Sequence, residues 1–329
     1  MQTLEKFISL GHTLAQFGTD EPSQRVLQRA VAENEWFTRR DVITAVRAIA
    51  QDMLTPQNLE RWLALYPTRP VAVPRQVLVF MAGNIPAVGF ADLLCVLAAG
   101  HRALVKYSSR DRALMEYIVQ LLNEDFDIRE YVPESHKPEL LLAMGSDSTA
   151  RILEERFGGI PRLVRSTRTS VAVLDGRESE SELTALCCDV GSFDGRGCRS
   201  VSHLLVPEEY DFKPLIEVLS RMEVSDKWRA IYTHNRAMAV MMGAEFMDCG
   251  VVTLSAGDQP SMSISELRYT TYGSATELAD WIAERDSTIQ CIVSHSFEHP
   301  RSVPFGRAQH PSLTDYPDGM DTMSWLLSY

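Results

Sequence analysis

The sequence contains few of the features that mark disulfide-linked, metal-binding or membrane proteins. Its six cysteines in 329 residues include no CxxC pair and no cysteine–histidine spacing typical of zinc. No run of 18 apolar residues occurs, and charged and polar side chains interrupt the first 17 residues, where a signal peptide needs a continuous apolar segment. We therefore expect a soluble, cytoplasmic protein with reduced thiols and no structural metal.

Basic residues are also scarce, since 32 Lys and Arg stand against 44 Asp and Glu, for a formal charge of -12. Such a surface repels the phosphates of nucleic acids and anionic membranes, and no basic stripe offsets this charge. Neither a nucleic acid nor a membrane is therefore expected as a partner.

The chain does contain a regular alternation of apolar runs and helical patterns. Residues 1–66 have the 3.6-residue periodicity of helices, with Asp41 as the expected N-cap of one of them, and prolines then break the chain. Apolar runs predict buried strands at 76–81, 102–107, 140–144 and 170–174, and helical patterns lie between successive strands at 88–99, 110–122 and 148–157. This order predicts a parallel, doubly wound α/β sheet that binds ligands at the carboxyl ends of its strands, followed by a second α/β lobe.

One cysteine has a different setting from the others. Cys198 lies in a glycine-rich loop, residues 191–199, ahead of an apolar run. Glycines allow close approach to a ligand, a loop exposes its side chains, and Arg199 can favour the reactive thiolate. The alternative for any cysteine is a buried structural role, and the apolar helix or strand contexts of the other five favour it: Cys95, Cys187, Cys188, Cys249 and Cys291.

Two more motifs follow predicted strands. The side-chain amide of Asn84, in the segment 83–86, can donate a hydrogen bond to a developing oxyanion, although Asn is also a common turn residue. Gly145 and Ser146 precede a helix, whose free N–H groups and dipole suit a pyrophosphate. The usual GxGxxG dinucleotide fingerprint is absent.

Together and in this order, the motifs resemble the aldehyde-dehydrogenase superfamily, and within it the LuxC-like acyl-CoA/acyl-protein thioester reductases. The resemblance extends over residues 74–327. Superfamily motifs are matched at 83–86 (Trp-Asn-Phe-Pro-like), 105–109 (Val-Lys-Pro-Ser-Glu), 145–146 (Gly-Ser), 195–198 (the catalytic cysteine loop) and 304–306 (Pro-Phe-Gly). The LuxC-like family is suggested by the segments 82–86, 197–202 and 318–323.

The resemblance implies an aldehyde-dehydrogenase-like α/β fold, with a doubly wound parallel-sheet cofactor domain and a smaller α/β catalytic domain. We expect a helical N-terminal region at 1–70, the nicotinamide-cofactor domain at 71–178 and the catalytic domain at 179–302. Residues 303–329 are expected to pack back on the cofactor domain.

The resemblance also implies a reaction. Cys198 attacks the thioester of an acyl-CoA or an acyl carrier protein, Asn84 and the backbone N–H of Cys198 hold the oxyanion, and hydride from NADPH (or NADH) releases an aldehyde. The expected cofactor contacts are Lys106, Ser109, Arg110, Gly145, Ser146 and Phe305. A homo-oligomer is also expected.

The sequence departs from the superfamily pattern at two places. The general-base Glu of the oxidising enzymes falls on Val173, so the acyl-enzyme is expected to be reduced or passed to a thiol rather than hydrolysed. The Glu-x-Phe-Gly segment has its nearest match at 269–273, and His203, which can fold close to Cys198, is expected on a strand face. The alternatives left open are an acyl-phosphate reductase of the same superfamily and an acyl-transfer or scaffold protein without hydride chemistry.

Cofactor choice depends on one position in the match at 105–109. NAD-preferring members of the superfamily have a Glu there, which binds the ribose hydroxyls and repels a 2′-phosphate, whereas this chain has Ser109. Lys106 and Arg110 can add charge-assisted bonds to the phosphate, which favours NADPH. The alternative is that Ser109 only caps a helix beginning at Arg110.

Overall fold

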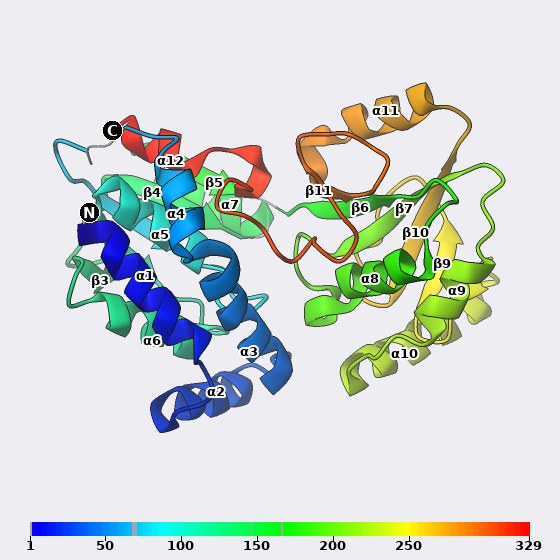
Figure 1. The fold of residues 1–329 in the computed structure, drawn as a ribbon, viewed down its shortest axis with the longest axis horizontal. Helices are drawn as coiled ribbons and strands as arrows, with labels where there is room; N and C mark the ends of the chain where they lie inside the picture. The colour runs from blue at the N-terminus through cyan, green and yellow to red at the C-terminus, as the bar shows by residue number, and fades with distance from the viewer. Residues whose placement is uncertain (1, 68–70, 146, 166) are drawn as a thin grey trace. The chain divides into compact units, whose positions relative to one another are not determined.

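The N-terminal third of unit 1 is helical, as its periodicity predicts (Figure 1). The computed structural model describes residues 2–67, 71–145, 147–165 and 167–329. The first helices are α1 (Gln2–Ala15), α2 (Glu21–Glu33), α3 (Arg39–Ala48), the π-helical turn η1 (Ile49–Met53) and α4 (Pro56–Leu63). The expectation of Asp41 as an N-cap is wrong, because the cap of α3 is Thr38, whose Oγ1 accepts the Asp41 N–H at 3.1 Å.

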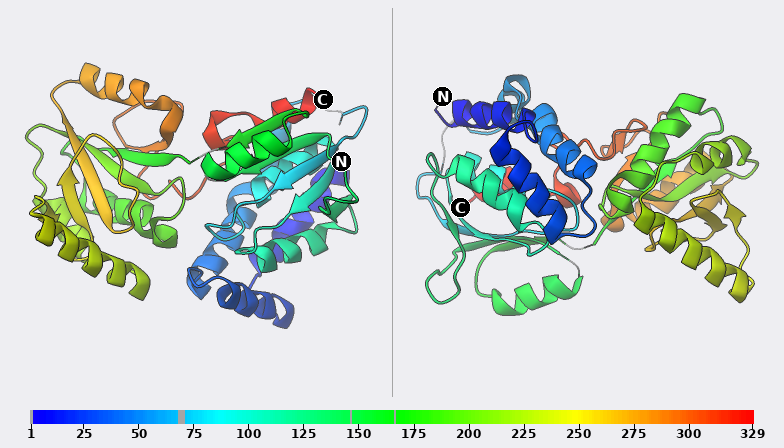
Figure 2. Two further views of the ribbon diagram at one scale, coloured as in Figure 1. Left: turned by 180° about the vertical axis from the view of Figure 1, so that it is seen from behind. Right: turned by 90° about the horizontal axis from the view of Figure 1, so that it is seen from below.

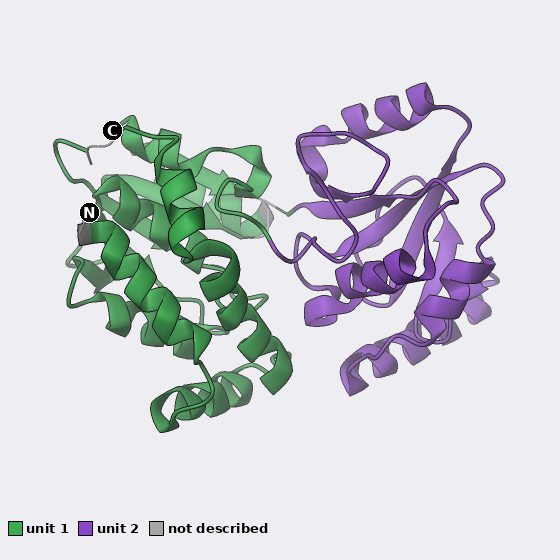
Figure 3. Ribbon diagram, viewed as in Figure 1, with its two compact units in different colours: residues 1–167, 311–329 green, residues 168–310 purple. Residues whose placement is uncertain are grey.

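Unit 1 contains residues 1–167 and 311–329 around a five-stranded parallel sheet (Figure 3). Its strands lie in the order β3-β2-β1-β4-β5, and their bounds are β1 (Gln76–Phe80), β2 (Arg102–Lys106), β3 (Ile128–Glu130), β4 (Leu140–Met144) and β5 (Arg162–Arg165). The connecting helices are α5 (Phe90–Ala99), α6 (Arg112–Leu122) and α7 (Asp147–Arg156). The doubly wound sheet is therefore confirmed, and its strand order reverses between β1 and β4.

Helices cover both faces of this sheet, as Figure 2 shows. Val77 and Val79 face a core that includes the apolar side chains of α1 to α6, whereas Leu78 faces the smaller core under α7. The N-terminal helices thus share a hydrophobic core with α5 and α6 instead of forming a separate layer.

The C-terminal segment also belongs to unit 1. Helix α12 (Thr322–Leu327) buries Met323 and Leu326 in the larger core. A buried ion pair contacts the first residue of α12. Arg165 Nη1 lies 2.7 Å from both carboxylate oxygens of Asp92, and Arg165 Nη2 donates to Thr322 Oγ1 at 2.6 Å.

Unit 2, residues 168–310, is built on a seven-stranded sheet in the order β12-β11-β6-β7-β10-β9-β8, of which only β8 pairs antiparallel. The strands are β6 (Thr169–Val173), β7 (Val201–Pro207), β8 (Met247–Asp248), β9 (Thr253–Ala256), β10 (Glu266–Tyr272), β11 (Ile289–Val293) and β12 (Ser302–Val303). Helices α8 (Glu180–Gly191), α9 (Lys213–Ser220) and α10 (Asp226–Met242) pack on one core of the unit, and α11 (Ala275–Glu284) packs on another.

The strand expected at 170–174 forms, but it pairs with β7 and β11 in this second sheet and does not extend the first one. Strand β5 takes the edge position next to β4. The two units divide the chain after residues 167 and 310, away from the domain boundaries expected after 178 and 302, and the division into functional domains stays a prediction. Within the described ranges, no helix is both long and apolar enough to cross a membrane.

Candidate active site

The turns that follow β1, β2 and β4 meet at one edge of the unit 1 sheet. Phe80, at the end of β1, is in register with both Lys106 at the end of β2 and Ala143 in β4. Gly145 directly follows β4 and the half-buried Asn84 lies four residues after β1, so the structure brings these predicted residues to the edge where the strand order reverses. In open α/β sheets this is the position of the ligand-binding crevice.

The turn that carries Asn84 is packed against the segment after β2. A Cβ atom on Gly83 would overlap Ser108 Oγ, so a larger residue there would force this segment to shift. At the other end of the turn, Ala87 has a left-handed backbone with φ +54°, and its N–H donates to Asp111 Oδ2 at 2.8 Å. Two fixed points therefore hold Asn84, and the sequence pattern identified neither Ser108 nor Asp111.

The loop with the predicted cofactor residues precedes α6. Ser109 and Arg110 are exposed, as is Lys106, and the Arg110 carbonyl accepts a hydrogen bond from Asn34 Nδ2 at 2.9 Å. Helix α6 begins at Arg112 with Asp111 at the N-cap. The alternative in which Ser109 caps the helix is therefore wrong, because the helix begins three residues later.

The prediction for the Gly-Ser motif needs a correction. The Gly145 N–H is not free for a phosphate, because it donates to the Arg165 carbonyl at 3.2 Å and so continues the pairing of β4 with β5. The absence of a side chain at Gly145 matters, since a Cβ atom would lie 2.8 Å from Thr149. Ser146 lies outside the described residues.

In unit 2, Cys198 is exposed in the loop between the 3-10 turn η2 (Ser192–Gly195) and β7. The loop contains three successive left-handed residues, Phe193, Asp194 and Gly195, with φ of 54°, 52° and 66°. For residues other than glycine this backbone is strained, so the surrounding packing must hold it. The hydroxyl of Ser170, on β6, donates to the Cys198 carbonyl at 2.9 Å and fixes the backbone next to the thiol.

Hydrogen bonds join the segment 304–309, which contains the predicted cofactor residue Phe305, to α8 and to the Cys198 loop. The Asp189 carboxylate, on α8, accepts hydrogen bonds from the N–H groups of Gly306 (2.6 Å) and Ala308 (2.9 Å). Burial raises the pKa of Asp189 to about 6, against the effect of these two donors. Arg199 is buried, and its Nε donates to the Ala308 carbonyl.

Two more contacts complete this arrangement. Gln309 Nε2 donates to Ser200 Oγ at 3.1 Å, and the Gln309 amide lies 3.4 Å from the position of a Cβ atom on Gly197. The Phe305 side chain is 9% exposed and meets the His295 ring edge-on at 5.7 Å between centroids. The structure thus brings Cys198 and Phe305 onto linked segments, and the role of Phe305 toward a cofactor stays a prediction.

The other cysteines divide into two groups. Cys95, Cys187, Cys249 and Cys291 are buried, and burial raises the pKa of both Cys187 and Cys249 to about 12. The expectation of a structural setting is wrong for Cys188, which is exposed on α8 because it lies one position away from the inward-facing Cys187. Cys198 differs from Cys188 in its irregular, tightly held loop.

His203 occupies the expected strand face. It lies on β7, fully buried, with Nε2 2.9 Å from Thr270 Oγ1 and its ring stacked on Trp281 at 5.0 Å. Burial, followed by the charge of Arg285, lowers the pKa of His203 to about 4. The neutral ring is therefore part of the folded core and not a base beside Cys198.

This buried histidine predicts a loss of stability in acid. Well above pH 6.5 the ring is neutral in both the folded and the unfolded chain, but as the pH falls from 6.5 toward about 4 mainly the unfolded chain takes up the proton. The shift corresponds to at most about 3 kcal/mol of unfolding free energy. Urea unfolding of His203→Gln at several pH values should show a shallower decline than that of the wild type; parallel curves would contradict this.

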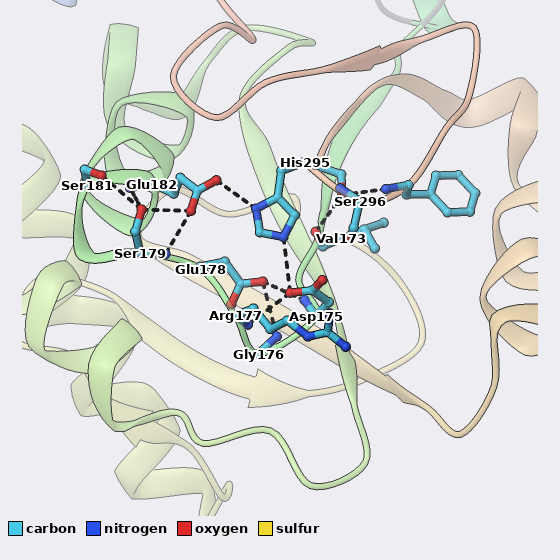
Figure 4. Close-up of polar contacts among 12 residues, drawn as sticks. Val173, Asp175, Gly176, Arg177, Glu178, Ser179, Ser181, Glu182, His295 and Ser296 are labelled. Atoms are coloured by element: carbon cyan, nitrogen blue, oxygen red, sulfur yellow. Dashed lines mark hydrogen bonds and ion pairs between the residues drawn. The ribbon is translucent and has the colours of Figure 1, made fainter.

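Four polar side chains, those of Asp175, Glu178, Glu182 and His295, form a cluster in unit 2 (Figure 4). His295 contacts Glu182 through Nδ1 (2.7 Å) and Asp175 through Nε2 (3.2 Å), and Glu182, followed by Asp175, raises the pKa of His295. Ligand atoms of Asp175, Glu178 and His295 lie within 4.8 Å of one another, so the expected lack of a metal is untested. In the described structure the cluster ties the end of β11 to α8.

Comparison with solved structures identifies the fold. Aldehyde dehydrogenase 21 from Physcomitrella patens, solved with its product succinate, is similar over 99% of this chain and 83% of its own, at 12% identity and a TM-score of 0.67. An acetylating aldehyde dehydrogenase from Geobacillus thermoglucosidasius is similar over 95% of this chain and 83% of its own (11% identity, TM-score 0.61).

An indole-3-acetaldehyde dehydrogenase solved with NAD+ is similar over 89% of this chain and 71% of its own (14% identity, TM-score 0.62). By sequence, no family model and no curated protein matches. The chain therefore has the α/β fold of the aldehyde-dehydrogenase superfamily, with a doubly wound parallel sheet in one unit.

Proposed function

We propose that the protein reduces an acyl thioester, carried on CoA or on an acyl carrier protein, to an aldehyde. The observation that carries this proposal is the exposed Cys198 thiol, in a loop held by Ser170 and by the segment 304–309. In the same unit, Cys187, Cys249 and Cys291 are buried. The likeness to an acetylating aldehyde dehydrogenase supports the choice of a thioester, since the fold accommodates that reaction class.

The proposed reaction begins at the thiolate of Cys198. Its sulfur forms a bond to the acyl carbon, the C–S bond to the carrier breaks, and the released carrier thiolate takes a proton from solvent. The Asn84 amide and the backbone N–H of Cys198 donate hydrogen bonds to the oxyanion.

A nicotinamide cofactor, when bound, supplies the hydride that reduces the acyl carbon by two electrons. The resulting thiohemiacetal oxyanion on Cys198 collapses, the bond to sulfur breaks, and the aldehyde leaves with the thiolate restored.

Hydrolysis of the acyl-enzyme lacks a base at the superfamily position. Val173 lies in β6 with 1% of its surface exposed, so it can neither bind nor activate a water molecule. The next carboxylate along the chain, Asp175, accepts the Arg177 N–H and contacts His295. The side chains present therefore favour reduction or transfer over hydrolysis.

The proposed site of a phosphorylated dinucleotide is the edge of the unit 1 sheet. No side chain caps the first turn of α6, which leaves backbone N–H groups and the positive end of the helix dipole for an anion. Lys106 and Arg110 are exposed nearby, and Ser109 brings no negative charge. These features support NADPH as the preferred cofactor.

The cofactor preference can be tested at Ser109. Ser109→Glu should weaken NADPH binding by about 10-fold or more, because it places a carboxylate where the 2′-phosphate is proposed, and should leave NADH binding less affected. Ser109→Gln is the neutral control of the same size. Cofactor fluorescence gives the dissociation constants of NADPH and NADH for each variant. If Ser109→Glu and Ser109→Gln have the same ratio of these constants, the 2′-phosphate does not bind near residue 109.

The reaction itself is tested by comparing acyl donors. NADPH oxidation with a panel of acyl-CoAs, together with detection of the aldehyde, should reveal turnover that acyl phosphates do not support. Turnover with acyl phosphates alone would favour the reductases of that class. Acyl transfer to a thiol without NADPH oxidation would favour the non-reducing alternative.

A further inference from the structure

Asp111 stands at the N-cap of α6, but its side chain does not cap the helix. Only 3% of the residue is exposed, and Oδ2 accepts the Ala87 N–H at 2.8 Å across the edge of the sheet. The other oxygen, Oδ1, is buried without a hydrogen-bond partner in the described part of the chain. The carboxyl group of Asp111 therefore binds the Ala87 N–H and does not cap the first turn of α6.

The bond to Ala87 holds a backbone conformation that needs support. Ala87 is left-handed, its carbonyl accepts the Phe90 N–H at 3.1 Å, and it closes the turn that begins at Gly83. Gly83 packs on Ser108 of the segment that ends at Asp111, whose own N–H donates to the Ser108 carbonyl at 3.2 Å. Residues 108–111 therefore hold the Asn84 turn at both of its ends.

We propose that Asp111 is a positioning residue, which fixes the direction of the Asn84 amide by holding the Ala87 N–H. This inference rests on the proposed function, in which Asn84 donates to the oxyanion. Burial raises the pKa of Asp111 well above its usual range, and the Ala87 N–H opposes this only in part. A neutral acceptor is thus sufficient, and asparagine is the conservative replacement.

The test compares two substitutions of Asp111 in the rate at which an acyl-CoA acylates Cys198. Asp111→Ser can cap α6 but cannot reach Ala87, and should slow acylation by roughly 10- to 100-fold, as expected for a small misplacement of a catalytic group. Asp111→Asn keeps the acceptor and should stay within about threefold of the wild type. Asp20→Ala, which removes the N-cap of α2 in the same unit, controls for general destabilisation and should leave the rate unchanged.

A double-mutant cycle separates positioning from loss of structure. If Asp111 acts through Asn84, Asp111→Ser combined with Asn84→Ala should acylate no more slowly than Asn84→Ala alone. Multiplication of the two effects would overturn the proposal, as would Asp111→Ser with the wild-type rate.

If the wild type forms no acyl-enzyme at all, the proposed function is wrong. Amide hydrogen exchange then still tests whether Asp111 holds the Ala87 N–H. Asp111→Ser should then speed exchange of the Ala87 N–H while the amides of α6 stay protected, and Asp111→Asn should preserve both. Equal protection of Ala87 in Asp111→Ser and the wild type would refute the positioning role by itself.

Discussion

Incubation with an acyl-CoA and no cofactor should add one acyl group to the wild-type protein and none to Cys198→Ala or Cys198→Ser. The thiol at this position is exposed, and the loop that carries it is fixed by the Ser170 hydroxyl and by the bond from Arg199 to Ala308. Alanine has no nucleophile, and serine has a hydroxyl that is not ionised at neutral pH. Intact-protein mass spectrometry measures the adduct.

Cys188→Ser is the matched control, because it removes the other exposed thiol of the same unit from a regular helix. It should acylate as the wild type does, and so should Cys187→Ser, whose thiol is buried. An acyl adduct on Cys198→Ala would place the nucleophile elsewhere, and loss of the adduct in Cys188→Ser would identify where.

Asn84→Ala should slow acylation of Cys198 by about 100- to 1,000-fold, the usual effect of removing one oxyanion donor. The turn should keep its shape, because Gly83 still packs on Ser108 and Ala87 is still held by Asp111. Rapid-quench mass spectrometry gives the rate, and thermal unfolding checks that the variant is folded.

Asn58→Ala is the matched control for an asparagine in unit 1. Its side chain donates to the Asp52 carbonyl at 2.9 Å, in the helical region, and its loss should leave the acylation rate unchanged. If a folded Asn84→Ala protein acylates at the wild-type rate, Asn84 only stabilises the turn and does not bind the oxyanion, which is the alternative role of an asparagine at this position.

The sequence was informative where one local signal determines the structure. The buried parallel strands β1, β2 and β4 are continuous apolar runs, so their positions are visible without any knowledge of their partners. Gly100 ends α5 as expected, since it adopts a left-handed backbone with φ +90°. The glycines around Cys198 likewise indicated an exposed loop, and the thiol is exposed.

Other features depend on pairing and were not visible. Strands β3 and β5 have only three and four residues, and β5 begins and ends with arginine. The run at 169–173 reads as a strand, but its composition does not say which sheet it joins. Long-range contacts at the site share this property: Asp189 binds Gly306 across 117 positions of the chain, and neither residue shows a local pattern that predicts the other.

A single-turnover reduction of the isolated acyl-enzyme tests whether the acyl group on Cys198 is reduced to an aldehyde. Wild-type protein acylated on Cys198 and freed of CoA should, on addition of NADPH, lose its acyl mass and release one equivalent of aldehyde for each equivalent of NADPH oxidised. Loss of the acyl group as a carboxylic acid, or its transfer to an added thiol with NADPH left unoxidised, would show that the protein does not reduce its acyl-enzyme.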